Sequence, residues 1–540
     1  MKLRNLILIF VFLAPTYVFS ATCPSTTSDF VTRTGTTLCY QGKVFKFASF
    51  NMPGLTMVED PIQQFDPVSQ QWNSNNHDQF RAPTKEELED AISTLVQMGT
   101  RVTRIYPPTI RSSGNTDDQS YFTWDSGNSQ FVINPTLFRK LDYLLQLAKQ
   151  NNIKIIFPFI DANDFSHGNG GGKWGGISAF CAKFGLSCPE QSHLAFYKDL
   201  EKQFINQIVL PIVTRYKDNP AILAWETGNE LEKCFWSQSG SNWQCTTPVD
   251  DTTFSQWTKA VTAAIKNVDK NHLIMDGAMQ TSERHYTSDD GIDIVSFHAY
   301  PGSKSEQSQV GTRYVDEQSQ PATKANKAFV IGEMGLCYLD SCIQPTLARM
   351  LDGKTNLSGV LLWSMRFHQK DINSSPIAGG YFDHVESSSF LTPSNTHYRA
   401  YHWPGSHLDD NYQEIDVVAA VQKISDQLQG MPLADTYPRI STPPSKPQIV
   451  SVTRTDTGAV EVTFWGGAGA QSYTIVRTSD STPLSTGYSE IKVQQSGSTY
   501  TYGYEPYLDT TAPQGTLSYT VIAVNSAGST ASDSQSFYNQ

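Results

Sequence analysis

Residues 221–230, which read AILAWETGNE, decide the fold expected for this chain. The first five are small, β-branched or aromatic and carry no charge, which is typical of a short buried strand. This strand runs directly into Asn229 and Glu230. Further along, the apolar run Ala328–Ile331 leads in the same way into Gly332 and Glu333. In a barrel of parallel strands the C-terminal strand ends meet at one face, so both carboxylates are expected there.

From about residue 44 to residue 431 the sequence alternates short apolar strands with amphipathic helices. Strands are expected at Val44–Phe50, Arg101–Tyr106, Ile153–Asp161, Ala221–Trp225, Leu273–Asp276, Ile292–Tyr300, Phe329–Glu333 and Val360–Met365. Helices are expected over Leu137–Lys149, Leu194–Val213 and Ile415–Leu428, and a capping box at Thr84 and Glu87 opens another. Eight strands with mostly helical connections predict an α/β fold, a (β/α)8 TIM barrel. An open doubly wound sheet is the alternative, but no glycine-rich phosphate turn follows the first strand.

The chain changes character after residue 431. Residues 432–446 are polar and interrupted by prolines, which predicts a semi-stiff linker. Residues 447–540 then alternate apolar and polar positions with period two, as in Ala459–Trp465 and Ser472–Arg477. This segment resembles a fibronectin type III module, a small immunoglobulin-like β-sandwich. It is expected to act as a spacer or to contact sugars weakly.

The N-terminus has the pattern of an export signal. Lys2 and Arg4 precede the apolar core Leu6–Leu13, and small or compact residues come before Ala21. Residues 1–20 are therefore predicted to be a signal peptide, residues 21–431 the barrel domain, and the mature protein secreted. An uncleaved membrane anchor is the alternative, but the apolar core is too short to span a bilayer.

The eight cysteines fit an exported protein, in which an even count indicates disulfides. Proximity in sequence suggests the pairs Cys23–Cys39, Cys181–Cys188, Cys234–Cys245 and Cys337–Cys342, although sequence alone does not fix connectivity. A zinc site is the alternative, but no C-x-x-C pair occurs, and no metal is expected. Asn356 and Asn373 begin N-glycosylation sequons.

A net charge of −12 argues against nucleic acid or an anionic membrane surface as the main partner. A neutral polymer such as a polysaccharide stays open, and the protein is expected to be a monomer. The glycine-rich run at residues 168–174 fits no phosphate-loop spacing, so no cofactor is expected.

Several expected strands end in polar residues. They are Asn51, Arg104, Asp161, Asn229, Glu230, His298, Tyr300, Glu333 and Trp363. Each alone has an ordinary explanation, such as a solvated carboxylate or a structural histidine. Together they would be costly at the ends of buried strands unless they meet one another or a ligand. Two glutamates from different strands supply what glycosidic bond cleavage needs: a proton donor, and a nucleophile or base.

The set resembles glycoside hydrolase family 5, a family of retaining β/α-barrel enzymes, over roughly residues 40–405. The resemblance rests on W-E-x-x-N-E at 225–230, F-H-x-Y-P at 297–301, Gly332-Glu333, and Trp363 after the last strand. Within the family the chain is most similar to endo-β-1,4-mannanases. The resemblance implies that Glu230 is the acid/base and Glu333 the nucleophile.

The same resemblance implies roles for the neighbouring residues. Asn229 would bind the sugar 2-hydroxyl, Arg104 and Tyr300 would orient Glu333, and His298 would belong to the network between them. A nearby Arg104 should lower the pKa of Glu333, whereas burial and the second carboxylate should raise that of Glu230. Trp363 is the foremost candidate for a flat face against sugar C–H groups, followed by Trp174, Trp236 and Trp243.

The chain departs from the mannanase pattern at several positions. Leu231-Glu232 stand where a proline and an arginine are usual, and Met334 follows Glu333 where an aromatic is common. Asp161 ends the third strand, where family 5 cellulases often place a histidine. Cleavage of β-1,4-mannan is expected to exceed that of cellulose. A β-glucanase or cellulase, an exo-acting β-glycosidase, a non-catalytic carbohydrate-binding protein and an adhesion protein remain the alternatives.

Overall fold

The computed structural model of the chain describes most of the sequence. The described residues are 22–60, 65–66, 71–72, 79–110, 120–162, 176–188, 193–231, 236–239, 242–245, 249–281, 286–300, 315–335, 340–353, 355–368, 385–387, 396–398, 401–405, 414–489, 491–496, 499–504 and 506–539.

Eight parallel strands close into a barrel, which confirms the predicted TIM-barrel architecture and excludes the open doubly wound sheet. In chain order they are β4 (Phe47–Asn51), β9 (Val102–Arg104), β12 (Lys154–Pro158), β13 (Ile222–Glu226), β16 (Leu273–Met275), β17 (Ile294–Ala299), β18 (Ala328–Gly335) and β19 (Leu357–Trp363). Neighbours in the chain are neighbours in the barrel, and β19 pairs with β4 to close it. Several strands are shorter than expected, because the residues after them leave the ladder and form the loops at the barrel mouth.

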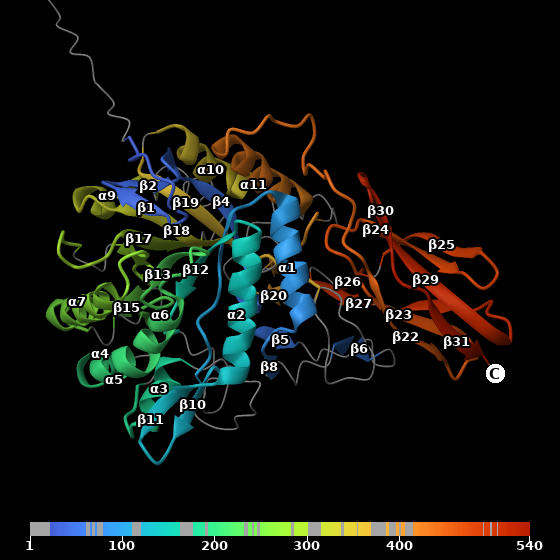
Figure 1. Ribbon diagram of the computed structural model, residues 1–540, viewed down its shortest axis with the longest axis horizontal. Helices are drawn as coiled ribbons and strands as arrows, with labels where there is room; N and C mark the ends of the chain where they lie inside the picture. The colour runs from blue at the N-terminus through green and yellow to red at the C-terminus, as the bar shows by residue number, and fades with distance from the viewer. Residues whose placement is uncertain are drawn as a thin grey trace, which may run out of the picture.

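Helices surround the barrel in Figure 1. They are α1 (Lys85–Met98), α2 (Pro135–Gln150), α3 (Ile177–Lys183), α4 (Leu194–Asp199), α5 (Glu201–Phe204), α6 (Leu210–Tyr216), α7 (Asp251–Val268), α9 (Val315–Lys324), α10 (Gln344–Leu351) and α11 (Glu414–Leu428). The capping box of α1 is confirmed, with the Thr84 and Glu87 side chains each bonded to the other's backbone N–H.

The single helix expected over Leu194–Val213 is wrong, because this segment is broken. α4 and α5 are followed by a π-helical turn at Ile205–Val209 before α6 begins. Pro211 lies at the start of α6 and has no N–H to donate to the carbonyl one turn earlier. A wider turn before a proline relieves the clash that a regular α-helix would have at that point.

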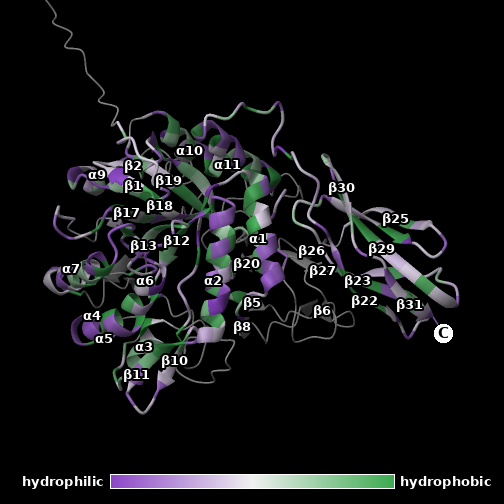
Figure 2. Cartoon of the chain, viewed as in Figure 1, coloured by the Kyte–Doolittle hydropathy of each residue, from purple (hydrophilic) through white to green (hydrophobic). Residues whose placement is uncertain are grey.

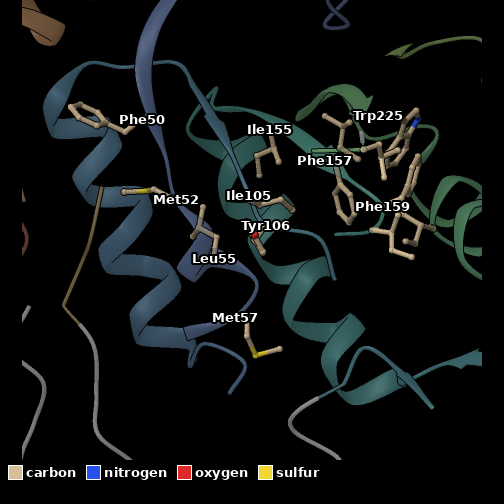
Figure 3. Packing of buried hydrophobic residues seen from close by; sticks show 14 of the residues in the cluster. Phe50, Met52, Leu55, Met57, Ile105, Tyr106, Ile155, Phe157, Phe159 and Trp225 are labelled. Carbon is tan, nitrogen blue, oxygen red and sulfur yellow. The ribbon is translucent and has the colours of Figure 1, made fainter. Parts of the chain in front are cut away.

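Two apolar layers hold the barrel together. One lies inside the barrel and contains Ile156, Ala224 and Val330. The other lies between strands and helices and contains Trp225, which stacks on Phe159 with ring centroids 5.6 Å apart. Figure 3 shows Trp225 beside Phe157 and Phe159. In Figure 2 the barrel strands are predominantly hydrophobic, while α1 and α2 alternate between the two colours along their length.

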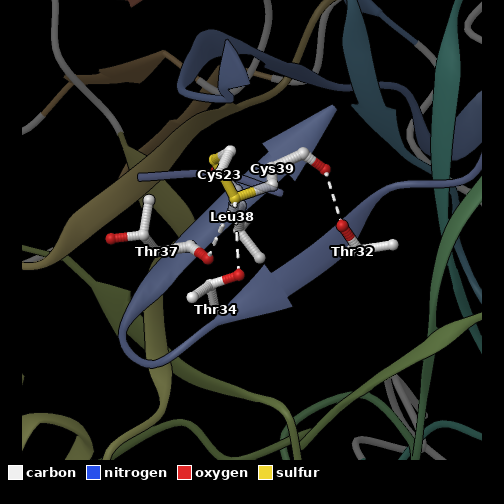
Figure 4. The surroundings of a disulfide bond; sticks show 6 residues. All are labelled: Cys23, Thr32, Thr34, Thr37, Leu38 and Cys39. Atoms are coloured by element: carbon white, nitrogen blue, oxygen red, sulfur yellow. Dashed lines mark hydrogen bonds between the residues drawn. A yellow bond between two sulfur atoms is a disulfide. The ribbon is translucent and has the colours of Figure 1, made fainter. Parts of the chain in front are cut away.

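Two of the four predicted disulfides are confirmed. Cys23 pairs with Cys39 beside the N-terminal hairpin, as Figure 4 shows, and Cys181 pairs with Cys188. Cys342 is also disulfide-bonded. Its expected partner, Cys337, lies outside the described residues, as does Cys234, so both remaining pairings stay predictions.

The C-terminal segment is built from antiparallel sheets with their own core. It contains β22 (Gln448–Arg454), β23 (Val460–Trp465), β24 (Ser472–Arg477), β25 (Thr482–Tyr488), β26 (Ile491–Ser496), β27 (Thr499–Tyr504), β28 (Tyr507–Asp509), β29 (Gly515–Asn525), β30 (Gly528–Ala531) and β31 (Gln535–Asn539). Phe464, Ile475 and Tyr519 lie at the centre of its apolar cluster. It touches the barrel at α1, where Gln97 Nε2 donates to the Ala468 carbonyl over 3.0 Å.

Short hairpins and single turns complete the described chain. They are β1 (Thr32–Thr34), β2 (Thr37–Tyr40), β3 (Lys43–Val44), β5 (Val58–Asp60), β6 (Phe65–Asp66), β7 (Gln71–Trp72), β8 (Gln79–Arg81), β10 (Phe122–Asp125), β11 (Gln130–Ile133), β14 (Trp236–Ser239), β15 (Asn242–Cys245), β20 (Val385–Ser387), β21 (Thr396–Tyr398) and the 3-10 turns Pro53–Leu55 and Asp340–Cys342.

Two sequence predictions concern the protein's surroundings. None of the helices within the described ranges is long and apolar enough to cross a membrane. The predicted signal peptide, residues 1–20, lies outside those ranges. At the first sequon, the Asn356 amide nitrogen donates to the Lys327 carbonyl over 2.9 Å, so the atom that would carry a glycan is engaged. Asn373, in the second sequon, is not among the described residues.

Candidate active site

The loop after β13 carries Glu230 and is clamped by backbone hydrogen bonds on both sides. Asn229 N–H donates to the Ile160 carbonyl over 2.7 Å, and Leu231 N–H donates to the Gly277 carbonyl over 2.8 Å. At Gly277 an added Cβ would lie 1.8 Å from the Gly228 carbonyl oxygen, so the two backbones approach as only glycine allows. Glu230 itself has φ of 49°, a left-handed conformation that is unusual for a glutamate. The surrounding bonds hold this strained residue in place.

Glu333 extends from β18 into the same region. The residue before it, Gly332, is packed so tightly that an added Cβ would lie 2.7 Å from Ser296 Oγ and 3.1 Å from His298 Nε2. His298 comes from the neighbouring strand β17, which pairs with β18 in parallel. A glycine at this position therefore lets the imidazole approach the strand that carries Glu333 closely.

The two glutamates meet at one nitrogen of the His298 ring. His298 Nδ1 lies 2.8 Å from Glu230 Oε1 and 3.6 Å from Glu333 Oε2. An oxygen of Glu230 and an oxygen of Glu333 lie within 4.8 Å of each other. Tyr300 donates its hydroxyl hydrogen to Glu333 Oε2. The expected convergence of Glu230, Glu333, His298 and Tyr300 is thus present.

Arg104, at the end of β9, is fully buried, and each of its five N–H groups has an acceptor. Nε and Nη2 donate to the two oxygens of Glu226 over 2.6 Å and 3.1 Å. The second Nη2 hydrogen goes to Asn229 Oδ1 over 2.7 Å. Nη1 donates to Glu333 Oε1 over 2.8 Å and to Asn51 Oδ1 over 3.4 Å. We call Arg104, Glu226, Asn229 and Glu333 the Arg104 cluster.

Burial and charge act against each other at these residues. Burial alone would lower the pKa of Arg104, but Glu226 and Glu333 outweigh it and raise the pKa above its usual value. Burial raises the pKa of the Glu226 carboxyl, which Arg104 opposes. For His298, burial would lower the pKa, yet Glu333 and the hydrogen bond to Glu230 raise it above 6.5. The imidazole between two carboxylates therefore favours its protonated form.

Asn229 is held from three sides. Its Oδ1 accepts from Arg104, while Nδ2 donates to Asp161 Oδ1 over 2.8 Å and to the Tyr106 hydroxyl over 3.3 Å. Tyr106 donates to the other Asp161 oxygen over 3.1 Å. Arg104 can only donate and an ionised carboxylate can only accept, so these two neighbours fix which end of the amide is oxygen. To bind a sugar hydroxyl, Nδ2 would turn one hydrogen away from Tyr106.

Trp363, at the end of β19, is half-buried beside this group. Its ring meets the Tyr106 ring edge to face, with centroids 5.7 Å apart. Of the other tryptophans expected to contact sugar, Trp174 lies outside the described residues. Nothing is described of the side chains of Trp236 and Trp243, on the hairpin β14–β15.

The seven residues with a predicted catalytic or binding role lie at the carboxyl ends of barrel strands or directly after them: Arg104, Asn229, Glu230, His298, Tyr300, Glu333 and Trp363. Two residues of the network had no predicted role: Glu226, quoted only as part of a motif, and Tyr106, placed within a strand. Strand alternation provided a signal for Glu226, since Trp225 faces the helices and the next side chain must face the barrel interior. A glutamate there requires a buried cation.

Glu230, His298 and Glu333 also form the one group of donor atoms among the described residues with spacing that would suit a metal ion. His298 Nδ1, however, already shares its hydrogen-bonding position with both carboxylates. Two carboxylates and an imidazole at these distances are equally suited to proton transfer and nucleophilic attack at a carbon placed between them.

Comparison with known proteins agrees with this geometry. The family model Cellulase (glycosyl hydrolase family 5) matches residues 61–369. Mannan endo-1,4-beta-mannosidase A of Hypocrea jecorina is 26% identical over 327 residues, 57% of this chain and 63% of its own length. Mannan endo-1,4-beta-mannosidase F of Aspergillus clavatus is 30% identical over 182 residues, 34% of each chain. The chain thus spans less than two thirds of the length of these curated relatives.

A solved structure shares the fold. The endo-1,4-beta-mannanase from Rhizomucor miehei superposes with a TM-score of 0.50 and 18% sequence identity, over 74% of this chain and 99% of that chain. At this identity the likeness supports the barrel fold alone.

Proposed function

The chain belongs to glycosyl hydrolase family 5, and from that premise we propose that it hydrolyses β-1,4-mannosidic linkages in mannan-type polysaccharides with retention of anomeric configuration. The observation that carries the mechanism is the approach of Glu230 and Glu333, whose oxygens lie within 4.8 Å. Retaining enzymes keep their carboxyl groups about 5–5.5 Å apart, whereas inverting enzymes need about 6.5–9.5 Å to admit a water.

In the first step Glu333 attacks the anomeric carbon while Glu230 protonates the leaving oxygen. Arg104 and Tyr300 each donate to one oxygen of Glu333, which fixes the orientation of its carboxylate. Glu230 is the more exposed of the pair and is oriented by His298. The products are a free chain end and a glycosyl ester on Glu333.

In the second step Glu230 takes a proton from water, and the water oxygen attacks the anomeric carbon. The glycosyl ester bond breaks, and Glu333 leaves with the bonding electrons. Protonated His298 beside both carboxylates supports this exchange, because its positive charge moderates the repulsion between them. Two displacements at one carbon restore its original configuration.

Mannan is proposed as the substrate because the relatives reported above carry mannan endo-1,4-beta-mannosidase names. Mannose and glucose differ in the orientation of the 2-hydroxyl. We assign recognition of this hydroxyl to Asn229, which Asp161 and Tyr106 hold in place. A buried site that pairs one epimer and leaves its own groups unpaired with the other discriminates strongly. A β-glucanase or cellulase of the same fold is the competing function, since the family model is named for cellulase.

We also propose that the protein is exported and acts extracellularly as a monomer, with residues 1–20 as its signal. Disulfides at Cys23–Cys39 and Cys181–Cys188 support an oxidising compartment. The linker at 432–446 and the fibronectin type III-like assignment of 447–540 belong to the same proposal, supported by the antiparallel sheets and separate core of that segment.

The test is release of reducing ends from mannan, glucomannan, cellulose and mixed-linkage glucan at equal enzyme concentration. Mannan should be cleaved fastest, and NMR of the first product should show the β-anomer. Turnover of cellulose or mixed-linkage glucan equal to that of mannan would replace the substrate assignment. An α-anomer as first product would exclude the retaining mechanism. Binding without release of reducing ends would favour a non-catalytic carbohydrate-binding protein.

A further inference from the structure

Glu226 is a buried carboxylate that the two-glutamate mechanism does not use. Its side chain is 0% exposed, and it lies on β13 four residues before Glu230. Both of its oxygens accept from Arg104, over 2.6 Å and 3.1 Å. A buried glutamate is rare without a specific partner, so the question is what this pair does for the residues around it.

Arg104 joins Glu226 to the nucleophile. The guanidinium is planar and its five N–H groups point in fixed directions. Since Glu226 takes one Nε and one Nη2 hydrogen, the plane cannot rotate without breaking two bonds. The Nη1 hydrogens are then aimed at Glu333 and Asn51, and the remaining Nη2 hydrogen at Asn229. Glu226 thereby determines where Arg104 meets both functional side chains.

We propose that Glu226 is a positioning residue that fixes the orientation of Arg104 and thereby the place where Arg104 holds Glu333 for attack. This inference rests on the proposed glycosidase function and deepens it. The alternative is that Glu226 only neutralises a buried arginine. The two differ in whether loss of one Glu226 acceptor oxygen slows attack by Glu333 while the substrate probe still binds.

Glu226→Gln keeps the size of the side chain but replaces one of the two oxygens that accept from Arg104 with an amide nitrogen, which can only donate. The orientation of Arg104, and with it the rate of attack by Glu333, then reports the effect of that single change.

The experiment measures attack by Glu333 alone. An activated aryl 2-deoxy-2-fluoro-β-glycoside forms an ester with Glu333 while the aryl oxide leaves with the bonding electrons, so no proton from Glu230 is needed. The inactivation rate is measured from pH 3 to pH 7 with mannobiose and cellobiose probes, and mass spectrometry locates the adduct. In Glu226→Gln the plateau rate should fall about tenfold or more, because an amide NH2 group replaces one of the two oxygens that accept from Arg104. The affinity for the probe should stay within about twofold of wild type.

Two further variants interpret the result. Glu226→Asp keeps both acceptor oxygens on a shorter side chain, so its plateau rate should lie between those of Glu226→Gln and wild type. Asp269→Asn removes a buried carboxylate at the end of α7, away from the Arg104 cluster, and should change neither the plateau rate nor the affinity for the probe. A wild-type plateau rate in Glu226→Gln, or a probe affinity that falls as much as the rate, would overturn the positioning inference. If Glu226→Gln does not fold, a wild-type plateau rate in Glu226→Asp overturns the positioning role.

The wild-type arm separates this inference from the function it rests on. If neither probe labels Glu333 in the wild-type protein, the proposed retaining glycosidase is wrong. Labelling of wild type together with a Glu226→Gln profile that matches it refutes only the role of Glu226.

Discussion

Trp225 and Glu226 are adjacent on β13, yet their side chains enter two buried polar clusters with different roles. Glu226 points into the barrel and binds Arg104. Trp225 points to the helices, where its Nε1 donates to Asp269 Oδ2 over 2.6 Å. Asp269 also lies 2.6 Å from His272 Nδ1. We call Trp225, Asp269 and His272 the Asp269 cluster.

Each cluster contains a buried carboxylate with hydrogen bonds to both of its oxygens, Glu226 in one and Asp269 in the other. Burial and hydrogen bonding therefore do not distinguish a functional site from a structural cluster. The difference is where the bonds end. In the Asp269 cluster they end on the backbone: His272 Nε2 lies 2.9 Å from the Asn219 carbonyl, and Asp269 accepts from the backbone of Asn271. In the Arg104 cluster the hydrogen bonds reach Glu333. His298 Nδ1 lies 3.6 Å from Glu333 and 2.8 Å from Glu230, whose side chain is 13% exposed. A network that ends on a carboxylate at the barrel mouth can act on a ligand.

The largest effect on activity should come from replacing Glu230 or Glu333, the carboxylates at the barrel mouth. Glu333→Gln should reduce mannan hydrolysis about 10³-fold or more, because it removes the nucleophile. Glu230→Gln should lower it about 10²–10⁴-fold, since protonation of the leaving group is lost. An aryl glycoside with a good leaving group should suffer far less in Glu230→Gln. These rates are measured as initial velocities with each variant's fold checked by circular dichroism.

Asp269→Asn is the matched control, since it removes a buried carboxylate from the Asp269 cluster. Its turnover per folded molecule should stay within about twofold of wild type, because Asp269 touches no part of the site. A loss comparable with that of Glu230→Gln would abolish the proposed distinction between the clusters.

The second effect concerns stability in acid. Burial opposes ionisation of Asp269, but hydrogen bonds from His272 and Trp225 outweigh it and lower its pKa to about 2. A carboxyl with a depressed folded pKa contributes stability above its unfolded pKa and loses it as pH falls. The contribution is about 2 kcal/mol at neutral pH, lost between about pH 4 and pH 2.

Urea unfolding at pH 6 and pH 3 measures this contribution. At pH 6, Asp269→Asn should cost about 2–4 kcal/mol. The gap between wild type and variant should narrow toward pH 3. A gap that stays constant over this range would mean that the ionised carboxylate is not the stabilising species.

Much of the site was predictable from the sequence, because polar residues directly follow the apolar runs that form the barrel strands. Apolar runs located Glu230 and Glu333, and the barrel topology brought them together. Glu226 was missed because its partner Arg104 lies on a strand two positions away in the barrel, with β12 between them. Alternate strands of such barrels direct side chains into the same layer, which joins residues that no local pattern connects.

The strand boundaries and the break in the helix at Leu194–Val213 were not predictable for a different reason. They depend on which backbone groups the surrounding loops satisfy and on how a proline inside an apolar stripe is accommodated. Asn229 illustrates the same limit. Its position was expected, but its hydrogen bonds to Asp161 and Tyr106 depend on side chains from two other loops.

The smallest effect expected is a pH dependence opposite in sign to that of Asp269. Burial would lower the pKa of His298, but Glu333 and Glu230 raise it above the ordinary 6.5, while Arg104 opposes them. A histidine with a raised folded pKa stabilises fully below its unfolded pKa. That stability is lost as pH rises above about 6.5 and through the folded pKa. The melting temperature of wild type should therefore fall more between pH 6 and pH 8.5 than that of His298→Gln, which cannot gain a proton. If the melting temperatures of wild type and His298→Gln fall by the same amount, His298 is not held in its protonated form beside Glu230 and Glu333. The responses of His298 and Asp269 to pH would then no longer differ in sign.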